Sequence, residues 1–211
     1  MESRAINLAV LVSGSGTTLQ NLLHEIAAKR LRAQVKLVLA SRADAFALER
    51  ARNADINTTV VDRREFHDCP SFSTRIFQLI DEAGIDLICL AGWLCLLDIP
   101  QHWQHRIMNI HPALLPSFGG RGMYGMKVHQ AVLDHGCKVS GCTVHFVDDA
   151  YDSGPIVLQR CCPVLDDDTP QTLAARVFEE EKIAYPRAIR LYSENRLKVV
   201  GRRVWMDNES G

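Results

Sequence analysis

The sequence predicts an α/β protein built on a mostly parallel, doubly wound sheet of the Rossmann-like type, with helices on both faces. Apolar runs alternate with helical patterns along the chain, which is typical of βα units. The run 86–91 is apolar without a break, as expected for a strand that is covered on both faces. We see no linker, repeat or low-complexity tract in the 211 residues. One domain over 1–211, with halves 1–100 and 101–211, is therefore the simplest organisation.

Strands and helices alternate regularly in the first half. The expected strands are the apolar or β-branched runs 5–12, 35–40, 58–61 and 86–91. The expected helices have apolar residues spaced so that they share one face, and they cover about 19–26, 45–53 and 72–83.

The second half has more alternating strands. The runs 106–110, 139–146 and 156–164 are expected strands, and the last two read as neighbours. A helix is expected over 128–134, and 197–205 has the pattern of a terminal hairpin. The segment 169–194 is one long helix, or two helices broken near Pro186, because proline interrupts helical hydrogen bonding.

Composition restricts the partners and the compartment. The chain has 24 basic and 25 acidic residues, so no global field attracts nucleic acid or an acidic membrane. It has no run of about 18 apolar residues that would span a bilayer. Residues 1–4 lead directly into an apolar run, which leaves no room for a signal peptide, and we expect a cytoplasmic protein.

The seven cysteines do not suggest a metal site. Four lie in or beside apolar segments, where buried thiols are common: Cys89, Cys95, Cys161 and Cys162. Cys137 and Cys142 have no CxxC or His/Cys partner pair, so we expect no bound metal.

An amide and an imidazole end one of the expected strands. Asn109 and His111 are two residues apart, so in an extended strand they point to the same face. Asn can donate an N–H to a developing oxyanion, and His can carry a proton at neutral pH. Asp152 lies in a turn between two later strands and adds a carboxylate. The three residues can serve as donor, acid/base and orienter, and the alternative is a solvated strand end.

The segment Gly14-Ser15-Gly16-Thr17-Thr18 follows the first strand and opens a helix. Backbone N–H groups in this geometry can hold a phosphate, although a tight connection is the alternative. Leu19 replaces the third glycine of a dinucleotide fingerprint, and the lysine of a P-loop is absent.

Several motifs in order resemble the folate-dependent formyltransferases. They are Asn109-Ile110-His111-Pro112, Leu114-Leu115-Pro116, Thr143-Val144-His145-Phe146-Val147, Asp152-Ser153-Gly154-Pro155-Ile156 and the segment 11–20. The resemblance runs from Ile6 to about Trp205. It implies the formyltransferase fold and transfer of a formyl group from 10-formyltetrahydrofolate to the amine of glycinamide ribonucleotide, in de novo purine (IMP) biosynthesis. The first half would bind the nucleotide phosphate, and the second half would carry catalysis and folate binding.

The resemblance also implies site residues. Asn109 and protonated His111 would stabilise the oxyanion, and Asp152 would stabilise the imidazolium and raise its pKa. The loop residues Gly16, Thr17 and Thr18 would bind the substrate phosphate. Glu181 would bind the substrate amine, although a solvated acidic run over 179–181 is the alternative.

The implied folate site departs from the family pattern. It would use Leu94, Cys95, Leu96 and Leu97 together with the turn Asp148, Asp149, Ala150, Tyr151 and Asp152. The family usually has Met-Arg-Ile-Leu where this chain has residues 94–97, and an arginine often found near Cys69 is missing. Contacts to the glutamate tail of the folate are therefore left open.

A glycine-rich loop and two further histidines complete the candidates. The loop 118–125 is longer than the common family form, and we expect a mobile lid with Arg121 and Tyr124 as contacts. His129 follows this loop and is a candidate substrate contact. His145 is expected to pack in a strand and pair with a buried carbonyl.

Three alternatives keep the same core residues or the same sheet. A sister enzyme acting on methionyl-tRNA would need a further domain and a basic surface. A formyltetrahydrofolate hydrolase would use water as the acceptor. A non-catalytic nucleotide-binding module would have no need of all three of Asn109, His111 and Asp152. The sequence leaves open whether the protein is a monomer or a homodimer.

Overall fold

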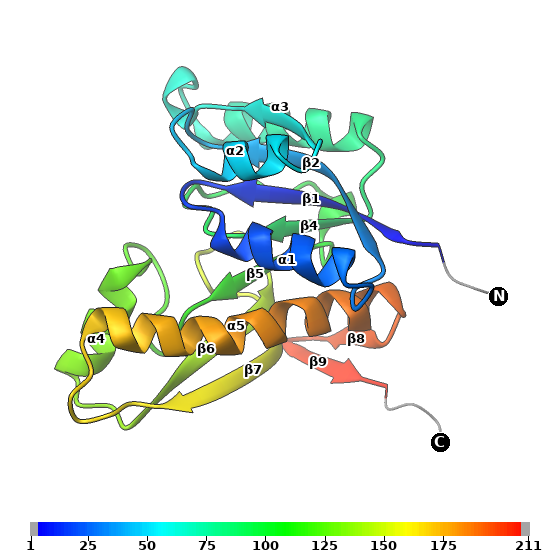
Figure 1. Cartoon of the computed structure of the whole chain (residues 1–211). Coiled ribbons are helices and arrows are strands. Elements are labelled where there is room, and N and C mark those ends of the chain that lie inside the picture. The colour runs from blue at the N-terminus through cyan, green and yellow to red at the C-terminus, as the bar shows by residue number, and fades with distance from the viewer. Residues whose placement is uncertain (1–3, 208–211) are drawn as a thin grey trace. The chain divides into compact units, whose positions relative to one another are not determined.

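The computed structural model describes residues 4–207 and contains two compact units, one ending at Met108 and the other beginning at Asn109 (Figure 1). The organisation as one domain with halves 1–100 and 101–211 stays a prediction. The expectation that no leader precedes the first strand depends largely on residues 1–3, which lie outside the described residues.

The first unit is a parallel α/β layer. Its strands lie in the order β3-β2-β1-β4, and every pairing among them is parallel. Their bounds are β1 Ile6–Val12, β2 Ala33–Ala40, β3 Asn57–Val60 and β4 Leu87–Leu90. The helices are α1 Thr17–Ala27, α2 Ala47–Arg52 and α3 Cys69–Glu82, with short 3-10 turns η1 Arg63–Glu65 and η2 Gln101–Trp103.

Strand β1 is the centre of this unit. It pairs with β2 on one side and with β4 on the other, and the side chains from Leu8 to Val12 have no exposed surface. Burial on both faces explains why the strand is apolar throughout rather than alternating. The same explanation holds for β4, whose four residues are all buried.

Helix α3 begins three residues before its predicted start at residue 72. The Asp68 carboxylate accepts a hydrogen bond from the Ser71 N–H at 2.8 Å, and a proline lies in the first turn. Both features stabilise a helix N-terminus, because an acceptor satisfies a free N–H and proline has no N–H to satisfy.

Strand β5, Ile107–His111, crosses the boundary between the units, and its last three residues belong to the second. The strand order continues as β5-β6-β7-β9-β8. The remaining elements are α4 Met126–Asp134, β6 Val139–Phe146, β7 Ile156–Pro163, α5 Pro170–Ser193, β8 Leu197–Val200 and β9 Arg203–Met206. The β6–β7 and β8–β9 pairings are antiparallel, which confirms the predicted neighbours and the terminal hairpin.

Helix α5 is a single helix, so the open question at Pro186 is answered. Thr169 caps it by accepting from the Thr172 N–H at 3.2 Å, and the helix continues through Pro186. A proline inside a helix costs roughly 3 kcal/mol. Burial of Tyr185 and Ile189 on either side of the proline offsets this cost.

The α/β class, with a mostly parallel sheet and flanking helices, is confirmed. The expected burial of Cys161 was wrong: Cys161 is exposed, whereas Cys89 and Cys162 are buried. Burial alternates along much of β7, so neighbouring residues point to opposite faces. Within residues 4–207, no helix is long and apolar enough to cross a membrane.

Candidate active site

The end of β5 brings Asn109 and His111 into the second unit. The chain beyond the strand is fixed by Thr143 of β6, whose hydroxyl donates to the Ala113 carbonyl at 2.6 Å and accepts from the Leu115 N–H at 3.0 Å. The Gln159 amide also donates to the Leu115 carbonyl at 2.9 Å. These bonds hold the chain in a defined turn, so the side chains at the strand end have a fixed direction.

Asp152 approaches the same point from the turn between β6 and β7. Its backbone has a φ of 53°, a left-handed conformation that Asp tolerates better than most residues. Gly154 lies so close to the Phe146 carbonyl that a Cβ would overlap it, so only glycine fits there. Asp152 Oδ1 lies 3.3 Å from Asn109 Nδ2 and 3.4 Å from His111 Nδ1. The structure therefore brings the three predicted residues together.

His145 packs in β6 as expected, and it is also a fourth member of this cluster, which was not predicted from the sequence. Its Nε2 lies 3.1 Å from Asn109 Nδ2 and 3.7 Å from Asp152 Oδ1. Its Nδ1 lies 2.8 Å from the Phe146 carbonyl, which is the predicted pairing with a buried carbonyl. Because a carbonyl can only accept, Nδ1 is the donor. In the neutral ring Nε2 is then the acceptor, and it fixes the orientation of the Asn109 amide.

The Asn109 amide has both of its N–H groups engaged in the cluster. One hydrogen points to His145 Nε2 and the other to Asp152 Oδ1. An oxyanion that binds to Asn109 must therefore replace one of these two partners. The bond to Asp152, at 3.3 Å, is the longer of the two.

Burial lowers the pKa of His111 below its ordinary value of 6.5. The Asp152 carboxylate and the Phe118 carbonyl act in the opposite direction, and His145 adds to the lowering. Asp152 does raise the pKa of His111, as expected, but the net shift is downward and the expected net increase was wrong. Burial outweighs the carboxylate because the His111 side chain is only 5% exposed. The pKa of Asp152 lies below its usual value, since bonds and charges from the two histidines and the Gly120 N–H outweigh burial.

The glycine-rich loop rests on the same residues. His111 Nε2 donates to the Phe118 carbonyl at 2.8 Å, and the Gly120 N–H donates to Asp152 Oδ2 at 2.9 Å. Phe118 has a φ of 55°, so the loop turns sharply where it reaches the site. Arg121 and Tyr124 are exposed, and within residues 4–207 no hydrogen bond or ion pair joins them to the cluster. The Tyr124 hydroxyl instead accepts from Lys127 Nζ at 3.3 Å. Mobility of this loop stays a prediction.

His129 is buried beside the cluster. Burial and the proximity of His111 lower its pKa to about 4, so the ring is neutral at physiological pH. Its Nδ1 has no hydrogen-bond partner among the described residues. The remaining five histidines are exposed, as expected for residues in polar surroundings.

Glu181 does not behave as part of a solvated run. Its neighbours are paired, Glu180 with Arg160 at 2.6 Å and Glu179 with Lys182 at 2.5 Å. Glu181 is half-buried, has no partner among the described residues, and its pKa is raised to about 7 by burial. A carboxylate in this state is available to a cationic or N–H-bearing ligand.

In the first unit, Gly16 begins α1 with a φ of 72°. No side chain caps this helix, and within the described chain no acceptor meets the backbone N–H groups of residues 16–18. A Cβ at Gly16 would lie 2.5 Å from the Ala47 Cβ. A bulky residue there would therefore disturb the packing of α2, in addition to any effect on a ligand.

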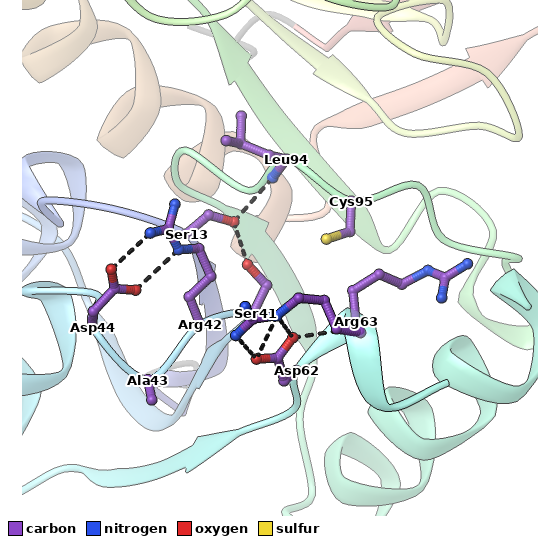
Figure 2. Close-up of a pocket in the computed structure, with 10 residues that line it drawn as sticks. Ser13, Ser41, Arg42, Ala43, Asp44, Asp62, Arg63, Leu94 and Cys95 are labelled. Carbon is purple, nitrogen blue, oxygen red and sulfur yellow. Dashed lines mark hydrogen bonds and ion pairs between the residues drawn. The ribbon is translucent and has the colours of Figure 1, made fainter. Parts of the chain in front are cut away.

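A pocket of about 490 Å³ lies beside Leu94 and Cys95 (Figure 2). The Leu94 N–H donates to Ser13 Oγ at 3.1 Å, which fixes this segment at the pocket wall. Arginines absent from the sequence-based candidates also line it, namely Arg42, Arg63 and Arg64. In Figure 2 Arg42 pairs with Asp44 on one side, and Arg63 lies with Cys95 on the other. The Arg63-Arg64 pair just before Cys69 was the sequence signal that could have found this wall.

The other predicted folate residues differ in exposure. Leu97 is buried, whereas Leu94 is 44% exposed and Leu96 accepts from the Cys69 thiol through its carbonyl at 3.4 Å. The turn 148–152 belongs to the second unit. There Asp148 accepts from the Ala150 N–H at 3.2 Å, and Asp149 and Tyr151 are exposed.

Comparisons with known proteins match nearly the whole chain. The family described as formyl transferase matches residues 6–189. The chain belongs to the formyl transferase family. This confirms the resemblance seen in the sequence.

This formyl transferase is similar in sequence to three proteins of known name. The phosphoribosylglycinamide formyltransferase of Escherichia coli is 34% identical over 97% of this chain and 95% of that protein. The glycinamide ribonucleotide transformylase 1 of Symbiobacterium toebii is 42% identical, with a TM-score of 0.90 over 97% of this chain and 95% of that one. The trifunctional purine biosynthetic protein adenosine-3 of Gallus gallus is 36% identical over 97% of this chain. The chain spans only 20% of that protein.

No group of three or more His, Cys, Asp or Glu side chains that could hold a metal occurs in the part of this formyl transferase that the structure describes. The absence of a metal from the site stays a prediction.

Proposed function

We propose that this chain transfers the formyl group of 10-formyltetrahydrofolate to the amine of glycinamide ribonucleotide, giving formylglycinamide ribonucleotide in purine biosynthesis. The observation that carries the proposal is the largely buried cluster in which Asn109 and His111 both lie within hydrogen-bond or ion-pair distance of Asp152, in a member of the formyl transferase family. A non-catalytic module would gain nothing from burying an amide, an imidazole and a carboxylate against each other, because burying polar groups costs stability.

The cluster supports the chemistry of acyl transfer. As the amine nitrogen bonds to the formyl carbon, the carbonyl oxygen gains negative charge, and Asn109 and His111 stabilise it. The developing charge also favours the protonated form of His111, which compensates for a pKa that burial lowers. Asp152 stabilises the imidazolium. The bond from the formyl carbon to the folate nitrogen then breaks, and the proton lost by the amine passes to that nitrogen through this cluster. His145 positions Asn109.

The ribonucleotide is proposed to use two features. Its phosphate binds the free backbone N–H groups of Gly16, Thr17 and Thr18, supported by the N-terminal end of the α1 dipole. Its glycinamide amine meets Glu181, whose carboxylate has no other partner among the residues described.

The folate is proposed to lie against residues 94–97 and 148–152. The arginine-lined pocket beside Leu94 and Cys95 offers the positive charge that the glutamate tail needs. Arg63 is the best candidate, since Arg42 pairs with Asp44 and Arg64 with Asp62. Among the described residues, the Arg63 guanidinium has no acidic partner and donates to the Phe66 carbonyl. Arg63 then takes the place of the arginine missing near Cys69. We also assign Arg121, Tyr124 and His129 to substrate contacts made when the loop 118–125 rearranges.

We place the reaction in the cytoplasm. All seven cysteines are free, which fits a reducing compartment. Whether the enzyme acts as a monomer or a homodimer is left to measurement by sedimentation.

A formyl-transfer assay tests the proposal. The purified chain is incubated with 10-formyltetrahydrofolate, and release of tetrahydrofolate is followed with and without glycinamide ribonucleotide. We expect release only with the ribonucleotide, together with a formylated product. Release without it would identify a hydrolase, and no release in either case would leave only a binding module.

A further inference from the structure

Helix α2 packs directly against the loop 14–16. The Ala47 N–H donates to the Gly14 carbonyl at 3.1 Å. The side chain of Ala47 occupies the space that a Cβ on Gly16 would need. The conformation of the loop thus depends on a helix that is distant from it in sequence.

Arg50 of α2 is held by three contacts, one with this loop, one with α1 and one with the residue that precedes α2. Its Nε donates to the Ser15 carbonyl at 2.9 Å, and its Nη1 donates to Gln20 Oε1 at 3.0 Å. Its guanidinium carbon lies 5.0 Å from the centre of the Phe46 ring. A guanidinium fixed at this many points loses little further freedom when a ligand binds beside it.

The bond from Arg50 sets the direction of a neighbouring N–H. In a trans peptide the C=O and the following N–H point in opposite directions. Because the Ser15 carbonyl points to Arg50, the Gly16 N–H points away from it, and in the described part of the chain nothing accepts from this N–H. Without Arg50 the Ser15–Gly16 peptide could rotate, and the N–H group would lose its direction.

Arg50 also has no acidic partner within residues 4–207, in contrast to Arg42 and Arg64. Its positive charge is therefore not neutralised locally, and it lies at the positive end of the α1 dipole.

We infer that Arg50 is a positioning residue for the phosphate of the ribonucleotide, acting through the Ser15 carbonyl on the backbone N–H groups at the start of α1. The inference rests on the proposed function. It assigns Arg50 no contact with the reacting atoms, and it restricts the effect of Arg50 to the phosphorylated substrate.

Steady-state kinetics of Arg50→Gln and Arg50→Lys test the inference, with Arg52→Gln as the matched control. Arg52 lies on the same helix and is exposed, and its guanidinium makes no hydrogen bond or ion pair within residues 4–207. Arg52→Gln therefore removes the same charge and leaves the bond from Arg50 to Ser15 intact. We expect Arg50→Gln to raise KM for the ribonucleotide at least ~10-fold, as for loss of a charge-assisted hydrogen bond. KM for the folate and kcat should change less than about twofold in Arg50→Gln, and Arg52→Gln should match wild type, because neither loses a contact with the folate or the reacting atoms.

A phosphate-free acceptor separates positioning from general damage. With glycinamide riboside, wild type and Arg50→Gln should react with similar kcat/KM, because no phosphate is present to be positioned. Arg50→Lys keeps the charge and one donor, so it should recover part of the ribonucleotide affinity, and it also serves if Arg50→Gln does not fold. An unchanged ribonucleotide KM in the Arg50 variants, or equal losses for both acceptors, would overturn the inference. The proposed function fails separately, if wild type transfers no formyl group.

Discussion

Replacing Glu181 by glutamine removes a carboxylate that is half-buried and has no partner among the described residues. The pKa of this group is about 7 in the folded protein against 4.5 for the ordinary side chain. The folded state therefore holds a proton that the unfolded chain releases, and wild-type stability falls as the pH rises from about 4.5 to about 7. Above pH 7 the loss is complete and constant.

The difference between these two pKa values corresponds to about 3 kcal/mol of unfolding free energy, and solvent reaching a side chain that is not fully covered reduces it to ~2 kcal/mol. Glutamine keeps the size and removes the charge. We therefore expect Glu181→Gln to be more stable than wild type by about 2 kcal/mol at pH 8, and nearly equal to it at pH 4.5, where Glu181 is protonated in the folded state.

Urea unfolding of both proteins at pH 4.5 and pH 8 measures this difference. Glu180→Gln is the matched control: it removes an adjacent carboxylate that is paired with Arg160 at 2.6 Å, so it should show no gain at pH 8. In the same preparation, Glu181→Gln should raise KM for the ribonucleotide, because the proposed partner of the amine is lost. A gain of the same size at both pH values would refute the reasoning, since the effect would not depend on ionisation.

Three further predictions concern the cluster and the loop. Asn109→Ala and His111→Ala should each lower kcat roughly 100-fold or more with smaller changes in KM, because oxyanion stabilisation acts on the transition state; steady-state kinetics within a few-fold of wild type would exclude these roles. Asp152→Asn removes the charge that opposes burial, so the pKa of His111 should fall further in an NMR titration, and the alkaline limb of kcat should move to lower pH; an unmoved pKa would assign Asp152 another role. Gly16→Ala should lower the melting temperature through its overlap with Ala47, and unchanged thermal unfolding would show that the helices adjust.

Local sequence patterns were enough to predict most of the elements and the central cluster. The two-residue spacing of Asn109 and His111 defines one face of a strand, and Asp152 lies in a turn between two expected strands. His145 has the same spacing from Thr143, yet only the pairing of strands reveals which residues it meets. The start of α3 was predictable from Asp68 and the following proline, which are ordinary N-terminal signals.

The remaining features depend on burial and on contacts between distant segments. The net direction of the His111 pKa depends on how much of the ring is covered, and the neighbouring carboxylate alone suggested the wrong sign. The pocket beside Leu94 has walls from separate loops after β2, β3 and β4, so no single motif describes it. The role inferred for Arg50 also depends on contact between distant segments, because Arg50 lies 35 positions along the sequence from Ser15, to whose carbonyl it donates.

The contacts of the loop 118–125 make it an internal competitor of the substrates. The Phe118 carbonyl accepts from His111 Nε2, and the Gly120 N–H donates to Asp152 Oδ2. Any ligand group that uses these atoms must first displace the loop, so the measured affinity is the intrinsic affinity reduced by the fraction of molecules in which the loop has left. The length and glycine content of this loop can thus set apparent substrate affinity without any change in the residues that bind substrate.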